Sequence, residues 1–186
     1  MHLMKNTVSQ ILTLIVLFLI TITCDAQYLG STDWQSEEDF RADEKKIIDN
    51  VLWLEENPFA TESNDTKAIT EYVLEWLEQT PYISVTLDRI FTERITRSKK
   101  YKYGDKFLIT YLFGKSLYVI QNPEDKSEIN SAVRGVEGMI KVYIELLKAD
   151  SKAFNRRLEF YKGLYERGGL EEYVRDEFEQ RGIGTS

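Results

Sequence analysis

The most distinctive charged segment lies between residues 94 and 106, where six cationic side chains accompany a single carboxylate. Two tyrosines alternate with its lysines, so aromatic rings and positive charges share one short stretch. A cation near an anionic surface contributes about 1 kcal/mol of attraction, and the pattern therefore predicts docking on an anionic lipid, a glycan or an acidic protein. The candidate binding residues are Arg94, Arg97, Lys99, Lys100, Tyr101, Lys102, Tyr103 and Lys106.

The same segment also fits a second interpretation, in which it is a solvated loop that compensates charge within the molecule. Residues 33–57 carry nine acidic side chains against three basic ones, which is the opposite imbalance. Nucleic acid is not predicted as a partner, because the chain as a whole has 31 acidic and 24 basic residues and a formal net charge of −7.

Carboxylates form the other candidate for chemistry. Glu71, Glu75 and Glu78 stack at helical spacing, and such a set could supply an acid–base pair or a calcium site, with Trp76 nearby to stack a sugar. The spacing nevertheless favours the solvated face of an amphipathic helix, because Trp76 falls on the apolar side. The pair Glu55-Glu56 receives the same solvated interpretation.

Composition excludes many catalytic mechanisms. The only imidazole and the only thiol are His2 and Cys24. Without them the chain has no base for Ser-His-Asp or Cys-His catalysis and no His or Cys ligand for zinc or haem. No Gly-rich phosphate loop and no twelve-residue calcium loop occurs. The sequence therefore predicts no cofactor and no metal, and it leaves carboxylate chemistry as the remaining enzymatic option.

Residues 1–26 are predicted to be a signal peptide. The dense apolar stretch Ile11 to Ile22 has twelve residues, within the usual length of a signal-peptide core and shorter than a membrane span. The small residue Ala26 precedes Gln27, where we expect cleavage. Two alternatives remain, namely a lipid on Cys24 or an uncleaved anchor. Each alternative places the remaining chain outside the cytoplasm, either periplasmic or secreted.

The remaining chain is predicted to be helical, with a short linker at 27–35, one all-helical domain at 36–181 and a flexible tail at 182–186. Apolar periodicity and capping residues indicate about seven helices. The fold class is an all-α single domain, either a bundle or an irregular array of antiparallel helical hairpins. The expected helices span residues 37–56, 65–79, 85–96, 106–120, 123–148, 151–167 and 170–181.

Two parts of the predicted helical pattern are ambiguous. Residues 106–120 could form two strands turned at Gly114, but their polar residues fall near one stripe at helical spacing, which favours a helix in the middle of a bundle. The long helix that follows contains Gly135 and Gly138, which mark a kink or a close approach of a neighbouring element, because glycine otherwise costs about 1 kcal/mol there.

The leading functional hypothesis is an exported, non-enzymatic helical module that binds a protein partner or an anionic surface in the cell envelope or outside the cell. One alternative is a hydrolase or lyase that acts on glycans with carboxylates alone. The other is a structural envelope protein that is tethered to a membrane through a retained N-terminal segment or a lipid on Cys24.

Overall fold

The computed structural model describes residues 29–58, 64–97 and 99–182, and this part of the chain is all-helical, with no strand. The all-α prediction is therefore confirmed. The predicted signal peptide at 1–26 lies outside the described residues, as do residues 27 and 28 of the linker and 183–186 of the tail. Among the helices that are described, none has both the length and the apolar character needed to cross a membrane.

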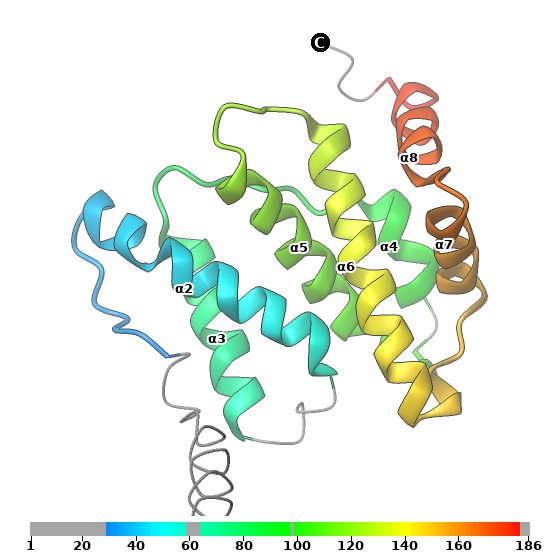
Figure 1. The fold of residues 1–186 in the computed structure, drawn as a ribbon, viewed down its shortest axis with the longest axis horizontal. Helices are drawn as coiled ribbons and strands as arrows, with labels where there is room; N and C mark the ends of the chain where they lie inside the picture. Colours follow the sequence, from blue (N-terminus) through cyan, green and yellow to red (C-terminus); the bar gives the residue numbers. More distant parts are fainter. Residues whose placement is uncertain (1–28, 59–63, 98, 183–186) are drawn as a thin grey trace, which may run out of the picture.

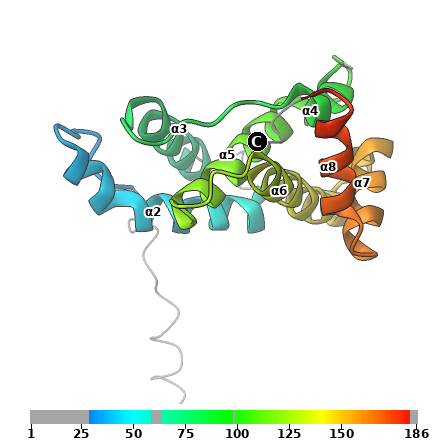
Figure 2. The same cartoon turned by 90° about the horizontal axis from the view of Figure 1, so that it is seen from above.

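The described helices carry the labels α2 to α8. They are α2 (Glu37–Glu56), α3 (Asn64–Gln79), α4 (Arg89–Thr96), α5 (Gly104–Gln121), α6 (Glu128–Ala149), α7 (Arg156–Glu166) and α8 (Leu170–Glu179), with a short 3-10 helix, η3 (Ser151–Ala153), before α7. Helices α5 and α6 run through the middle, α2 and α3 lie on one side of them, and α4, α7 and α8 lie on the other (Figures 1 and 2).

Local capping explains where the first helix begins. The Ser36 side chain accepts a hydrogen bond from the backbone N–H of Asp39, and the Asp39 carboxylate accepts one from the Ser36 N–H at 2.8 Å. This reciprocal arrangement satisfies two otherwise unpaired helix-start donors. The predicted start of the first helix is therefore correct to the residue, and the same holds for its end at Asn57, which precedes a proline.

The predicted start of the long helix at Pro123 was wrong, because α6 begins at Glu128. Both the backbone and the side-chain N–H of Asn122 donate to the Tyr118 carbonyl at 2.9 Å, so Asn122 closes α5 rather than opening α6. The cap of α6 is Ser127, whose hydroxyl accepts from the Asn130 N–H. Residues 123–127 form the connecting loop between the two helices.

Two further boundaries differ from the prediction. Helix α4 begins at Arg89 rather than at 85. The N-cap residue Asp88 has an extended backbone, and its side chain binds Tyr111 and Lys115 of α5 instead of capping the helix. The expected single helix from 151 is divided into η3 and α7. Asn155 caps α7 by accepting from the N–H groups of Arg157 and Leu158.

Residues 104–121 form one helix, so the alternative with two strands is excluded. Helix α5 contributes to two hydrophobic clusters. Its first half places Phe107 and Tyr111 in a cluster with α4, α6, α7 and α8, while its second half places Phe113, Leu117 and Ile120 among the core side chains of α2 and α3. The prediction of a helix in the middle of the fold is therefore confirmed.

Glycines allow α5 and α6 to approach closely. A Cβ atom on Gly114 would lie 2.7 Å from the Arg134 carbonyl oxygen and 2.9 Å from the Gly135 Cα, and a Cβ on Gly135 would lie 2.8 Å from the Tyr111 ring. No side chain larger than hydrogen fits at these distances. The expected close approach at Gly135 is therefore confirmed, and Gly114 is its counterpart on α5.

Candidate functional site

The predicted basic segment connects α4 to α5, and it rests on the turn between α6 and α7. The Tyr101 hydroxyl donates to the Ala153 carbonyl at 2.7 Å, and the Tyr103 hydroxyl donates to the Asp150 carboxylate at 2.7 Å. The Tyr101 ring also stacks on Phe107, with ring centroids 6.2 Å apart. Both tyrosines are half-buried and serve as anchors of the segment, so their hydroxyls are not available to a partner.

Hydrogen bonding controls the electrostatics of this anchor. The Tyr103 hydroxyl, the Lys102 ammonium and the Lys152 backbone N–H hold the pKa of Asp150 well below its usual range. Burial raises the pKa of Tyr101 above its ordinary value, and burial together with the Asp150 hydrogen bond raises that of Tyr103. The tyrosines therefore stay neutral and Asp150 stays ionised across the physiological pH range.

Two of the predicted cations are engaged within the molecule. Arg97 pairs with Glu93 one turn earlier at 3.0 Å, and Lys102 pairs with Asp150 at 2.9 Å while its Nζ atom lies 4.6 Å from the Tyr103 ring centroid. These ion pairs do not reach α2. The alternative in which the segment compensates the acidic first helix through direct pairing therefore finds no such contact among the described residues.

Three predicted cations, Arg94, Lys99 and Lys100, are exposed, and none of them has an ion pair within the described part of the chain. The α6–α7 turn presents two further exposed residues, Lys152 and Phe154, on either side of Ala153, whose carbonyl accepts the Tyr101 hydrogen bond. Lys99 and Lys100 immediately precede Tyr101 in the chain. Phe154 is 55% exposed. Neither residue could be predicted from the sequence, because each lies about 50 positions away and only the fold joins it to the basic segment.

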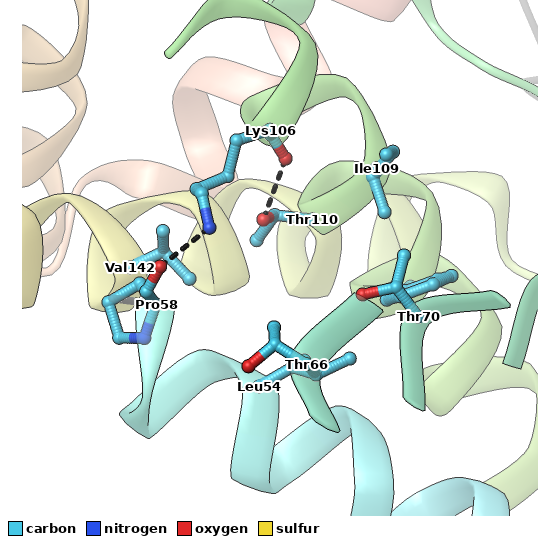
Figure 3. A pocket seen from close by; sticks show the side chains of 9 residues that line it. Leu54, Pro58, Thr66, Thr70, Lys106, Ile109, Thr110 and Val142 are labelled. Atoms are coloured by element: carbon cyan, nitrogen blue, oxygen red, sulfur yellow. Dashed lines mark hydrogen bonds between the residues drawn. The ribbon is translucent and has the colours of Figure 1, made fainter. Parts of the chain in front are cut away.

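Lys106 occupies a different environment from the other predicted cations. Its side chain lines a pocket of about 110 Å³ between α2, α3, α5 and α6 (Figure 3). The pocket walls are mostly apolar. They are formed by Leu54, Pro58, Thr66, Thr70, Lys106, Ile109, Thr110, Phe113 and Val142. The sequence prediction had placed Lys106 with the docking cations, whereas the structure separates it from them.

Burial determines the chemistry of Lys106. Its Nζ atom donates to the Pro58 carbonyl at 2.6 Å, and loss of solvent lowers the pKa of the amine to about 8. No carboxylate among the described residues forms an ion pair with it. Lys106 is partly buried, and a lysine without a counter-ion is unusual in such a position, because a desolvated charge ordinarily requires one.

The candidate carboxylates divide into two kinds. Glu71, Glu75 and Glu78 are exposed on α3 while Trp76 is fully buried, so the solvated interpretation is confirmed for that set. The same interpretation was wrong for Glu55. Its side chain is buried, and the Arg134 guanidinium holds it through two N···O contacts of 2.7 and 2.9 Å, with Lys141 at 3.2 Å.

A second buried charge was missed altogether. Lys115, on α5, is 1% exposed and binds the Asp88 carboxylate at 2.7 Å and the Glu128 carboxylate at 2.9 Å. The Tyr111 hydroxyl donates to the same Asp88 oxygen at 2.6 Å. One signal was available in the sequence, because Lys115 is the only charged residue between 107 and 123. This network joins three elements, and we assign it to structure.

We also looked for a metal site among the described residues and for similar proteins. Among the described residues no group of three or more His, Cys, Asp or Glu side chains is arranged to hold a metal ion. Comparisons with protein-family models, curated proteins and solved structures find no match to this chain.

Proposed function

We propose that this chain is an exported, non-enzymatic helical module that docks on an anionic lipid surface through its basic end, defined as Lys99, Lys100, Lys152 and Phe154. The observation that carries the proposal is that three exposed lysines and one exposed aromatic ring lie on two turns that are hydrogen-bonded to each other. None of these lysines forms an ion pair with a carboxylate of the described residues. Cations attract anionic headgroups, and an aromatic ring inserts at the interface between headgroups and acyl chains.

The anchored geometry supports docking because it reduces the entropic cost of binding. Tyr101 and Tyr103 already hold the basic segment against Ala153 and Asp150, so little ordering is needed on contact. The exposed ring of Phe154 supports a lipid surface as the partner, because the ring can insert between headgroups and acyl chains while the lysines contact the headgroups. The net charge of −7 opposes binding, so the attraction depends on this end of the molecule.

The test measures binding to vesicles that contain phosphatidylcholine with about one third phosphatidylglycerol, beside vesicles of phosphatidylcholine alone. Each lysine contributes about 1 kcal/mol, so the double variant Lys99→Gln/Lys100→Gln is expected to bind about 30-fold more weakly. The matched control, Lys67→Gln/Lys126→Gln, removes the same charge from two exposed lysines elsewhere and should bind as the parent does.

Three results would contradict the proposal. They are unchanged vesicle binding by the Lys99→Gln/Lys100→Gln variant, equal binding to neutral vesicles, and equal weakening by the control variant. Retention on an immobilised acidic protein without any vesicle binding would identify a protein partner instead. Replacing Phe154 by serine should lower vesicle binding without changing its salt dependence, because the ring contributes apolar insertion and no charge.

The remaining proposals concern export and catalysis. Export followed by cleavage after Ala26 predicts a mature chain that begins at Gln27, which mass spectrometry of the N-terminus tests directly. A lipid on Cys24 or a retained Met1 would instead support the tethered structural protein. The glycan-acting alternative requires two carboxyl groups about 5–10 Å apart in one cavity. The described residues that line the pocket beside Lys106 include none. A second hollow along α2 is lined by Asp43, Asp49 and Glu56, but Lys46 and Lys45 already pair with the two aspartates. We therefore favour the binding module.

A further inference from the structure

The pocket beside Lys106 has the composition of a small-ligand site. Leu54, Ile109, Phe113 and Val142 contribute apolar walls from α2, α5 and α6. Its polar groups are threonine hydroxyls and the Lys106 amine, so a single charge-bearing group faces an apolar space. Figure 3 shows Lys106 reaching from α5 across the pocket toward Pro58, with Ile109 and Thr70 on the far side. Binding pockets typically combine apolar walls with a few polar groups in this way.

The Lys106 ammonium has unused binding capacity. An ammonium group has three donors, and the structure records one hydrogen bond for it, to the Pro58 carbonyl at 2.6 Å. The neighbouring Thr110 hydroxyl donates to the Lys106 backbone carbonyl at 2.9 Å. Among the described residues that line the pocket, Lys106 is the one titratable side chain, so an anion that entered would meet one cation and no carboxylate of that lining.

We infer that this pocket binds a short-chain aliphatic monocarboxylate, with its hydrocarbon chain between α3 and α5 and its carboxylate on the Lys106 Nζ atom. The volume limits the chain length. An apolar cavity of about 150 Å³ holds benzene, so a pocket of about 110 Å³ accommodates a chain of about four carbons. A monoanion matches the single cation, whereas a phosphate dianion would remain half-neutralised.

Protonation should be coupled to binding. Burial lowers the pKa of Lys106 to about 8, so the free amine loses its proton just above neutral pH. A bound carboxylate stabilises the ammonium form and raises this pKa. Affinity should therefore be greatest near pH 6–7 and fall by at least about tenfold at pH 9.5, because above pH 8 the anion binds an amine that must first be protonated.

The experiment is calorimetric titration at pH 7 of the protein, expressed from the full sequence, with butyrate and with butan-1-ol. Butyrate should bind at one site and more tightly than the alcohol. Lys106→Met keeps the length of the side chain and removes its charge, and it should lower butyrate affinity by about 10- to 100-fold, the range for a charge-assisted hydrogen bond. Lys67→Met, at an exposed lysine on α3, is the matched control and should bind as the parent does.

Thr70→Leu provides a second variant whose folding does not depend on Lys106. It reduces the volume of the pocket and should weaken butyrate and butan-1-ol alike, while Lys106→Met affects butyrate alone. Methyl resonances of Ile109 and Val142 should shift during the butyrate titration. The inference is overturned if butyrate shows no saturable binding, if Lys106→Met binds it with parental affinity, or if affinity does not fall at pH 9.5.

Discussion

Removing the charge of Lys115 tests whether its buried network holds α4, α5 and α6 together. The perturbation is Lys115→Met, which keeps an unbranched side chain of similar length. It leaves the Asp88 carboxylate, 12% exposed, with the Tyr111 hydroxyl as its remaining hydrogen-bond donor, while Glu128, 49% exposed, can regain water. The cost therefore arises mainly at Asp88.

The structure allows this cost to be bounded. Removing one partner of a buried ion pair destabilises a protein by about 3–5 kcal/mol. The lower end applies here, because Asp88 keeps one donor and Glu128 is rehydrated, so we expect a loss of about 3 kcal/mol. Adding Asp88→Asn to the variant removes the Asp88 charge that has lost its Lys115 partner, and the double variant should recover about 1–2 kcal/mol of the lost stability.

Urea denaturation followed by circular dichroism measures these differences. For an m-value of about 2 kcal/mol/M, the Lys115→Met midpoint should fall by about 1.5 M. Lys67→Met removes an exposed lysine that lies 3.7 Å from Glu71, and it should change stability by less than about 0.5 kcal/mol. A Lys115→Met variant as stable as this control would show that the network contributes no net stability.

The remaining predictions concern glycines and pH. Gly135→Ala should destabilise the protein by about 1–3 kcal/mol in the same denaturation assay, because the new methyl group would meet the Tyr111 ring. Gly163→Ala should be neutral or stabilise the protein by up to about 1 kcal/mol, because a Cβ there would meet only the end of an arginine side chain at 3.4 Å. Asp43 governs part of the acid response. Burial acts to raise the pKa of Asp43, but hydrogen bonds from Trp34, Tyr72 and Lys46 outweigh it and leave the pKa lowered. Its stabilising effect is therefore complete above about pH 4, the unfolded value, and is lost as the pH falls through the lower folded value. The melting temperature of Asp43→Asn should accordingly vary less between pH 2 and pH 5 than that of the parent.

Much of the fold could be predicted because local signals determine it. The cap at Ser36, the stop before Pro58 and the apolar circumference of 106–120 each act within one or two helical turns. The start of α6 was misjudged because Asn122 has two possible roles, and Pro123 fits a helix start as well as a loop. Only the hydrogen bonds to Tyr118 decide between these roles.

The candidate site was less predictable, because its properties come from distant contacts. Periodicity placed Glu55 on a solvated face, but Arg134 and Lys141 lie about 80 residues further along the chain and bury it. Lys106 was grouped with the docking lysines by sequence proximity, although its position in the first turn of α5 places it in the pocket lining. A local pattern identifies charged residues, and the packing of remote helices determines which of them remain in water.

Helix α5 has a consequence for how the molecule loses its structure. It supplies core side chains to the cluster around α2 and α3 as well as to the cluster around α6, α7 and α8. Neither cluster can open without exposing one half of the same helix, and the glycine contact between Gly114 and Gly135 ties that helix to α6. We therefore expect the two ends of the array to melt in a single cooperative transition rather than as independent subdomains.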